Sequence, residues 1–100
     1  MKFLILSVTK HVVPPEAIVP MMDAMQGWID KYKTQFEQVW TFAGVSGGGG
    51  MLNVSSLEGL DQIMTEFPFD PFSDTQVYGL LDLPESLERY KQTFAAMMGG

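Results

Sequence analysis

The central part of the chain contains two short apolar runs separated by glycines. Residues 39–42 are β-branched or aromatic and residues 51–54 are again largely apolar, a composition typical of strands. The four glycines at 47–50 suit a turn that needs positive φ, or a place where something must come close to the backbone. Residues 39–54 therefore predict a β-hairpin, with its turn drawn from the glycines.

A strand and a helix are predicted before the hairpin. Residues 2–10 alternate weakly, with apolar side chains on both sides, which indicates a central strand or one covered on both faces. Two prolines within residues 11–15 end this strand, and a helix begins between Glu16 and Pro20, since proline is tolerated in a first helical turn. The apolar stripe of this helix recurs at helical spacing and comprises Ile18, Met21, Met22, Met25, Trp28, Ile29, Tyr32 and Phe36.

A second helix, a strand and a third helix are predicted after the hairpin. Residues 55–58 read as a capping box that starts a helix, which Pro68 ends. Residues 67–72 combine prolines with phenylalanines and predict a rigid apolar loop without regular structure. A strand over residues 74–81 and a helix over residues 84–98 follow. The apolar residues of that last helix are Leu87, Tyr90, Phe94 and Met97.

The order of these elements is typical of an α+β fold, a ferredoxin-like β-α-β-β-α-β sheet with an extra C-terminal helix, in one domain spanning residues 1–100. If the helices cover one face of the sheet, the other face keeps some of the apolar side chains Phe3, Ile5, Trp40, Phe42, Met51, Tyr78 and Leu80. Two such sheets placed face to face would bury them. We therefore expect a homodimer or higher homo-oligomer, with the candidate site in a cavity between the helix and sheet layers.

Composition excludes several kinds of partner and chemistry. The chain has 6 basic and 12 acidic residues, a net charge of −6, and no basic block, so neither nucleic acid nor an anionic membrane is expected as a partner. With no cysteine and one histidine, we expect neither a metal site nor disulfides, and a cytoplasmic location. The first apolar run is too short for a signal peptide, and no apolar segment is long enough to span a bilayer.

Residues 40–87 resemble the muconolactone isomerase family. The likeness lies in residues 40–54, in Ser56 and Leu60, in the segment FPFDPFSD at 67–74, and in Val77, Leu80 and Pro84. The spacing P-F-x-P-F-x-D is its most specific part. The resemblance implies a dimeric α+β barrel and a cofactor-free enzyme that moves a proton on a small unsaturated lactone in aromatic breakdown.

The chain departs from the family pattern at three places. It has Ser46, Gly47, Gly48 and Gly50 where the isomerases show Tyr-Ala-Asn and a serine, Asn53 where they have an acidic residue, and Leu83-Pro84 where they have His-Pro. We therefore expect a substrate from a wider class of unsaturated lactones, aromatic compounds or polyketide-like metabolites.

Two residues are candidates for proton transfer. An isomerase without a cofactor needs a base that titrates near neutral pH and a group that stabilises an enolate, in a mostly dry pocket. His11 follows the first predicted strand, and an imidazole is a suitable base near neutral pH, although a surface or capping role is the alternative. Asp23 falls roughly where the isomerases carry an acidic residue on their first helix, although it shares a helix face with Gln26 and Asp30 and is otherwise a solvated residue.

Four residues are candidates for substrate binding: Trp40, Asn53, Phe72 and Tyr78. Trp40 and Tyr78 could stack on a flat substrate, and the Tyr78 hydroxyl could donate to an oxyanion, with packing in the core or an interface as the alternative. Asn53 shares a strand face with Met51, opposite Leu52 and Val54, so it either bonds across an interface or orients a ligand.

The sequence thus predicts a cofactor-independent isomerase or cyclase that acts by proton transfer on a small unsaturated lactone, aromatic or polyketide-like metabolite. Two alternatives remain. One is a non-catalytic dimer that binds such a molecule or stabilises a partner enzyme, and the other is a cofactor-free monooxygenase of the same barrel superfamily. The resemblance favours an enzyme, whereas the scarcity of acid-base groups favours the non-catalytic dimer.

Overall fold

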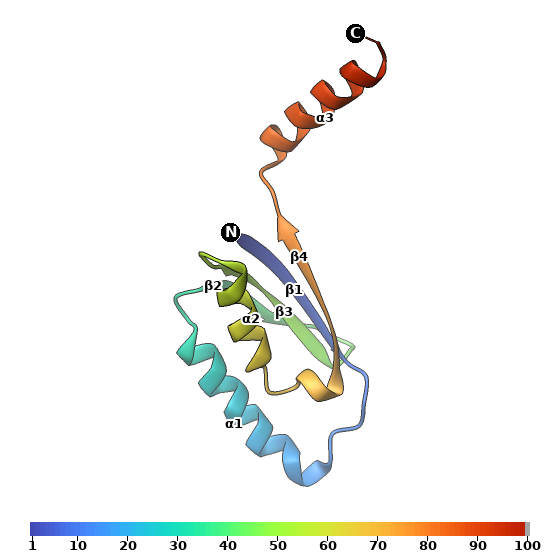
Figure 1. Cartoon of the computed structure of the whole chain (residues 1–100). Coiled ribbons are helices and arrows are strands. Elements are labelled where there is room, and N and C mark those ends of the chain that lie inside the picture. Colours follow the sequence, from blue (N-terminus) through green and yellow to red (C-terminus); the bar gives the residue numbers. More distant parts are fainter. Residues whose placement is uncertain (100) are drawn as a thin grey trace.

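The computed structural model describes residues 1–99 and confirms the predicted β-α-β-β-α-β order with an extra C-terminal helix (Figure 1). Its four strands form one antiparallel sheet in the order β2-β3-β1-β4. Helices α1 and α2 cover one face of that sheet. The elements are β1 (Lys2–Thr9), α1 (Pro15–Lys31), β2 (Phe36–Thr41), β3 (Gly47–Asn53), α2 (Leu57–Thr65), the 3-10 turn η1 (Asp70–Phe72), β4 (Ser73–Leu80) and α3 (Leu83–Met97).

The hairpin is present, but its glycines are in a strand and not in the turn. Residues 42–46 make the turn, and residues 47–50 begin β3 between β2 and β1. Side chains are excluded there because the neighbouring backbones come too close. An added Cβ would lie 2.2 Å from Ser7 O at Gly47, 2.4 Å from Trp40 O at Gly48 and 2.5 Å from Ile5 O at Gly49. The prediction of a glycine turn is therefore wrong, and the alternative of close backbone approach is confirmed.

The first helix is shorter than its apolar stripe predicted. α1 ends at Lys31, Tyr32 caps it, and Phe36 is already the first residue of β2. Both aromatic side chains still pack with the helix, since Tyr32 is buried in the core and the Phe36 ring lies 5.1 Å from that of Trp28. The spacing thus identified side chains that pack together in the core, although α1 ends before Tyr32 and Phe36 already belongs to β2.

Two local predictions after the hairpin also need correction. The serine that caps α2 is Ser56, whose hydroxyl accepts a hydrogen bond from Gly59 N at 3.0 Å, so the capping position is one residue later than the box at 55–58 implied. The loop predicted to be irregular contains the single 3-10 turn η1. Proline is tolerated in a first helical turn, and Pro71 lies there.

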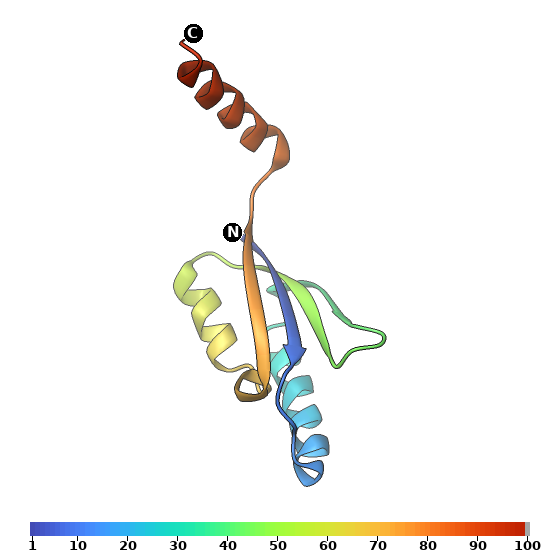
Figure 2. The same ribbon diagram turned by 90° about the vertical axis from the view of Figure 1, so that its right-hand side faces the viewer.

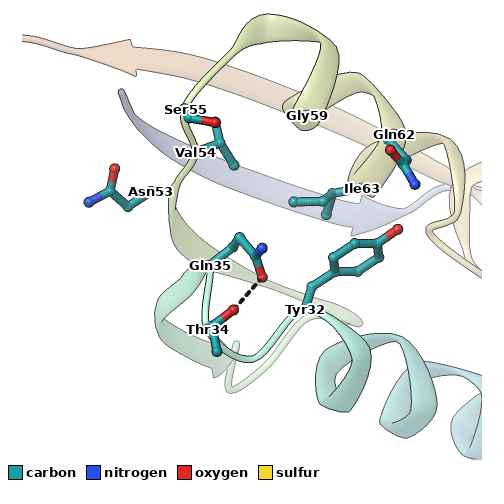
Figure 3. A pocket seen from close by; sticks show the side chains of 9 residues that line it. All are labelled: Tyr32, Thr34, Gln35, Asn53, Val54, Ser55, Gly59, Gln62 and Ile63. Atoms are coloured by element: carbon teal, nitrogen blue, oxygen red, sulfur yellow. Dashed lines mark hydrogen bonds between the residues drawn. The ribbon is translucent and has the colours of Figure 1, made fainter.

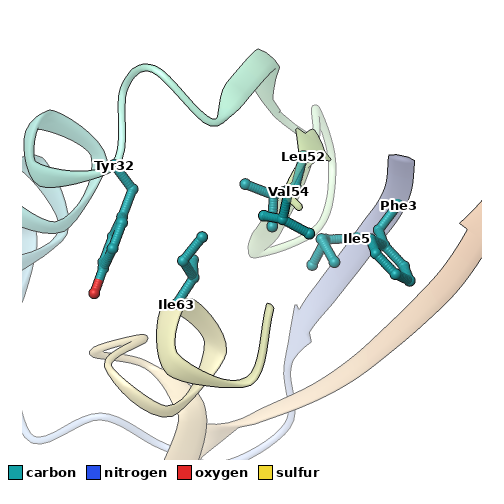
Figure 4. Packing of buried hydrophobic residues seen from close by; sticks show 6 residues of the cluster. All are labelled: Phe3, Ile5, Tyr32, Leu52, Val54 and Ile63. Atoms are coloured by element: carbon teal, nitrogen blue, oxygen red, sulfur yellow. The ribbon is translucent and has the colours of Figure 1, made fainter. Parts of the chain in front are cut away.

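The core lies between the sheet and the two covering helices. Its buried residues are Phe3, Ile5, Tyr32, Leu52, Val54 and Ile63 (Figure 4). Of the seven apolar residues considered for the helix-free face, Trp40, Met51, Tyr78 and Leu80 lie there, whereas Phe3 and Ile5 lie on the helix-covered face. Phe3 pairs with Leu52 on the helix-covered face, whereas the half-buried Leu4, Leu6 and Val8 face the other side. A strand that is apolar on both sides does not reveal which set faces the helices.

A charged cluster joins the end of α1 to the end of α2. The Tyr32 hydroxyl and the Lys31 ammonium both donate to the Glu66 carboxylate, with Lys31 Nζ 2.9 Å from Glu66 Oε1. These hydrogen bonds, that of Tyr32 first, lower the pKa of Glu66 from its ordinary value. A lowered pKa favours the folded state above the pKa of an unfolded glutamate, about 4.3, and this contribution is lost as the pH falls through the folded value.

Glu66→Gln is therefore expected to make the free energy of unfolding depend less on pH in the acid range. Between about pH 6 and pH 3, the wild-type protein should lose more unfolding free energy than the variant, because only the wild type must protonate this hydrogen-bonded carboxylate. Urea unfolding at a series of pH values measures this. Asp61→Asn, on the same helix and outside the cluster, should leave the slope unchanged. Equal slopes for wild type and Glu66→Gln would contradict the assignment.

α3 projects away from the rest of the molecule (Figures 1 and 2). Only Leu81 and Asp82 link it to β4, and none of its residues is buried. The radius of gyration is accordingly 17.7 Å, against about 13 Å for a compact domain of this length. The premise that all three helices cover the sheet is thus wrong for α3. Among residues 1–99 no helix is long and apolar enough to cross a membrane.

Candidate functional site

A hollow of about 680 Å³ lies between α1 and the helix-covered face of the sheet. We call it the chamber. Its lining is mostly apolar. Residues from α1, from the β2-β3 hairpin, from β1 and from the loop after α2 contribute to it, including Met25, Ile29, Thr41, Ser7 and Phe67. Its volume and its lining are those of a small-molecule site.

A second hollow of about 390 Å³ lies between the end of α1 and the start of α2 (Figure 3). It is lined by more polar than apolar surface, and two of its polar groups pair with each other, since Thr34 Oγ1 donates to Gln35 Oε1 at 2.9 Å. It offers little apolar surface to a ligand. We therefore place the candidate site in the chamber.

The glycines of β3 make the chamber possible. The strand register places Gly48 and Gly50 on the same face as Ser7 and Ile5, which is the face that α1 covers. Without side chains at these two positions, backbone forms that part of the wall and the space above it stays open. The glycines therefore allow β3 to pair closely with its neighbours and also leave space for the chamber beneath α1.

Three aromatic rings pack together in the lining of the chamber. The Trp28 ring lies 5.1 Å from the Phe36 ring, nearly perpendicular to it, and 5.1 Å from the Phe67 ring. Trp28 Nε1 donates to Ile63 O at 2.8 Å, which fixes the orientation of the indole. Rings held at such angles provide a rigid apolar surface for a flat molecule.

The polar groups of the chamber are neutral. They are the side chains of Ser7, Thr9, Gln26, Thr41, Ser46 and Ser73. Some already pair, since Ser7 Oγ lies 3.0 Å from Thr75 Oγ1 and Ser46 Oγ donates to Thr9 Oγ1 at 3.1 Å. Within residues 1–99, no Asp, Glu, His, Lys, Arg or Tyr lines the chamber. The protomer's own lining can thus hydrogen-bond and stack against a ligand but contains no strong base.

One side of the chamber is open to solvent. Met22 of α1, Val39 of β2 and Val45 of the hairpin turn line the chamber, yet 58%, 49% and 55% of their surfaces are exposed. We call this opening, rimmed by those three residues, the mouth. An apolar rim in water is a surface that a ligand or another protein segment can cover.

The structure places three of the predicted site residues close to the chamber. Trp40 is among the residues that line it, but the register places its side chain on the helix-free face with Gly49, where an added Cβ would lie 2.9 Å from the indole nitrogen. His11 is exposed two residues beyond the lining residue Thr9, and its backbone N–H donates to Phe72 O at 3.0 Å. Asp23 is exposed on α1 next to Met22 of the rim. Their proposed roles stay predictions.

The other three lie elsewhere. Asn53 is exposed at the far end of β3, where its Nδ2 donates to Glu37 Oε1 at 3.3 Å. Tyr78 is on the helix-free face of β4, and its hydroxyl donates to Gln76 Oε1 at 2.9 Å. Phe72 ends η1 and does not line the chamber formed by residues 1–99. The six candidates are thus not brought together in one protomer.

Sequence reasoning missed the polar residues Ser7, Gln26 and Thr41. Ser7 had a recognisable signal, because it interrupts an otherwise apolar run over residues 3–8 and is buried. Thr41 had no such signal in the sequence, because its place in the chamber depends on the strand register, in which it pairs with Gly48. Residues 1–99 contain no cluster of three or more His, Asp or Glu side chains that could hold a metal ion.

A four-stranded antiparallel sheet in this strand order, with two helices on one face and a hollow beneath them, defines a ferredoxin-like α+β fold. The chain is similar in fold to a solved structure of muconolactone isomerase, with a TM-score of 0.74 and 22% sequence identity over 84% of this chain and 92% of that one. This confirms, at the level of the fold, the resemblance seen in residues 40–87.

A second solved structure shares the fold. The 5-chloro-2-hydroxyhydroquinone dehydrochlorinase from Burkholderia phenoliruptrix AC1100, in complex with 2,5-dihydroxybenzoquinone, matches with a TM-score of 0.63 and 16% identity over 85% of this chain and 98% of that one. By sequence, no family model and no curated protein matches the chain.

Proposed function

We propose that the chamber binds a small, flat, neutral molecule, an unsaturated lactone or an aromatic or polyketide-like compound, and that the protein acts on it as a cofactor-independent isomerase or cyclase by proton transfer. The observation that carries the proposal is the 680 Å³ apolar chamber. The same fold occurs in muconolactone isomerase and in a 5-chloro-2-hydroxyhydroquinone dehydrochlorinase, two enzymes named after small ring compounds.

The shape of the chamber favours a flat ligand. Glycine backbone forms part of the lining and fixed aromatic rings form another part, and both offer flat surface to a planar molecule. The hydroxyls of Ser7 and Thr41 can donate to a carbonyl or enolate oxygen, as stabilisation of such an intermediate requires. A neutral ligand is favoured because no cationic side chain within residues 1–99 lines the chamber.

Filling the mouth is expected to weaken binding. Val39→Phe places a larger side chain at a half-exposed rim position, where it can enter the chamber without displacing the core. The affinity for coumarin, a neutral compound that is both aromatic and an unsaturated lactone, should fall by about tenfold or more, equivalent to about 1.4 kcal/mol. Isothermal titration calorimetry measures it.

Val77→Phe is the matched control. Val77 is another strand valine of similar exposure, 43%, on the same helix-covered face, but it lies on β4 outside the chamber. Its substitution should leave the affinity unchanged. Equal affinities for wild type and Val39→Phe, or an equal loss in both variants, would contradict binding in the chamber.

A second candidate function is a non-catalytic binding protein, which is favoured because no ionisable side chain among residues 1–99 lines the chamber. Hydrogen exchange separates the two. A proton-transfer enzyme should accelerate the exchange into D2O of the hydrogens next to the carbonyl of a β,γ-unsaturated γ-lactone, followed by NMR. His11→Ala or Asp23→Asn should slow this about a hundredfold if either supplies the base. Binding without any exchange would support the non-catalytic function.

We further propose that the protein is a homodimer or higher homo-oligomer through the helix-free face of the sheet. That face carries a row of apolar residues from all four strands, namely Leu4, Leu6, Val8, Trp40, Met51, Tyr78 and Leu80. Polar residues such as Gln38, Gln76 and Asp74 lie at its margins. An apolar centre with a polar rim is the usual anatomy of a protein interface.

A further inference from the structure

Ser7 is the one polar residue that is buried in the described part of the chain, residues 1–99. It lies on the helix-covered face of β1 with Phe3 and Ile5, and it lines the chamber. A buried hydroxyl without a partner costs free energy, so the partner of this one is informative. Within residues 1–99 that partner is Thr75, whose Oγ1 lies 3.0 Å from Ser7 Oγ. The remaining hydrogen-bonding capacity of the Ser7 hydroxyl is available to a ligand in the chamber.

Ser7 and Thr75 belong to a row of four residues that crosses the helix-covered face of the sheet. Thr41 of β2 pairs with Gly48 of β3, which pairs with Ser7 of β1. Ser7 in turn pairs with Thr75 of β4. Gly48 leaves a gap between Thr41 and Ser7, which both line the chamber. Thr75 is not part of the lining, so its hydroxyl reaches the chamber only through Ser7.

We propose that Thr75 is a positioning residue that acts through Ser7. The Thr75 hydroxyl donates to Ser7 Oγ, and Ser7 then donates to an oxygen of the ligand that lies over Gly48. This inference rests on the proposed function, because it needs a ligand in the chamber. Neighbouring strands lie about 4.8 Å apart, so an oxygen above the Gly48 backbone can come within hydrogen-bond distance of Ser7 Oγ. We call the two hydroxyls the Thr75–Ser7 relay.

The direction of the hydrogen bond between the two residues follows from what the ligand offers. A hydroxyl has one hydrogen and two acceptor positions, and at 3.0 Å either residue can donate to the other. If Ser7 donated to Thr75, it would present only acceptor positions to the chamber, and a carbonyl or enolate oxygen is itself an acceptor. With Thr75 as the donor, the Ser7 hydrogen is free for that oxygen. A ligand oxygen therefore selects the direction in which Ser7 can stabilise negative charge.

The relay both strengthens and orients the Ser7 hydroxyl. Hydrogen bonds in a chain polarise one another, so a Ser7 hydroxyl that accepts from Thr75 is a stronger donor to the ligand. Thr75 is β-branched and lies on a strand paired with β1, which restricts the directions of its own hydroxyl. The structural alternative is a cross-strand pair that only stabilises the sheet. Such a pair would not change how a bound carbonyl is polarised, and the two interpretations differ in that respect.

Infrared spectroscopy of coumarin with an isotope-labelled carbonyl tests the relay, because a donated hydrogen bond lowers the stretching frequency of a carbonyl. Thr75→Val removes the hydroxyl and keeps the branched shape of the side chain. We expect the frequency of bound coumarin to rise in Thr75→Val, to rise further in Ser7→Ala, and to return to the wild-type value in Thr75→Ser.

Calorimetric titration of the same variants gives the corresponding affinities. Coumarin should bind about threefold more weakly to Thr75→Val and about tenfold more weakly to Ser7→Ala. The control ligand is 2H-chromene, which has the same two rings without the carbonyl. Its affinity should stay within about twofold of wild type in both variants, because it offers no carbonyl to the relay.

Thr65→Val is the matched control variant, because the Thr65 hydroxyl donates to Asp61 O within α2, outside the chamber. It should change neither the carbonyl frequency nor the affinity. Equal frequencies in wild type and Thr75→Val, or an equal rise in Thr65→Val, would overturn the relay and leave chamber binding standing. If the wild type binds neither ligand, the proposed function fails and the relay fails with it. Should Thr75→Val not fold, Thr75→Ala gives the same comparison.

Discussion

Gly48→Ala is expected to lower the free energy of unfolding by about 3 kcal/mol or more, a large share of the roughly 5–15 kcal/mol of a typical domain. The added Cβ would lie 2.4 Å from Trp40 O and 3.3 Å from Thr41 Cα, both backbone atoms of the paired strand. Neither can move aside without separating β2 from β3. Urea unfolding of wild type and variant measures the loss.

Gly27→Ala is the control, and it is expected to have the opposite sign. Gly27 lies inside α1, and nothing comes within 4 Å of a Cβ added there. Alanine in a helix interior should stabilise the protein by about 0.5–1 kcal/mol. A Gly48→Ala variant within about 0.5 kcal/mol of wild type would show that β3 does not pack as described, because surface changes alone have effects of that size.

The second large effect is expected on assembly. Tyr78→Glu places a carboxylate in the centre of the proposed interface on the helix-free face, where Tyr78 pairs with Leu4. Burying an unpaired charge costs several kcal/mol, so the dissociation constant of the dimer should rise by about a hundredfold or more. Sedimentation equilibrium over a range of protein concentrations measures this shift.

The neighbouring variant Val77→Glu distinguishes an effect on the interface from a general effect on strand β4. Tyr78 and Val77 are adjacent on β4 and similarly exposed, at 47% and 43%, but they face opposite sides of the sheet. Val77→Glu should change the dissociation constant by no more than a factor of about three. A wild-type protein that is monomeric at micromolar concentration, or equal behaviour of the two variants, would remove the proposed interface.

Much of the fold could be predicted from local patterns. Prolines mark where β1 ends and α1 begins, and a serine followed by apolar residues at helical spacing identifies α2. What could not be predicted depends on distant contacts. The glycines at 47–50 suited a turn equally well, and only their pairing with β1 and β2 shows that a side chain cannot fit there.

The candidate site was less predictable than the fold for the same reason. Which side of β1 faces the helices depends on strand register, and Ser7 and Thr41 enter the chamber only because they pair with Gly48. Chemical type indicated the ionisable residues His11 and Asp23, whereas the side chains that line the chamber within residues 1–99 are neutral. The direction of α3 has no local signal at all, since an amphipathic helix packs equally well on its own chain or on another.

The central claim is that the chamber beneath α1 binds a flat, neutral small molecule. The eight methionines allow a direct test by NMR of methyl-labelled methionine during a titration with coumarin. Met22, Met25 and Met64 line the chamber, whereas Met1 and Met51 lie outside it. The account predicts saturable shifts of the first three methyl signals with the last two unmoved. Shifts confined to Met1 or Met51, or no shift of Met25 and Met64, would contradict it.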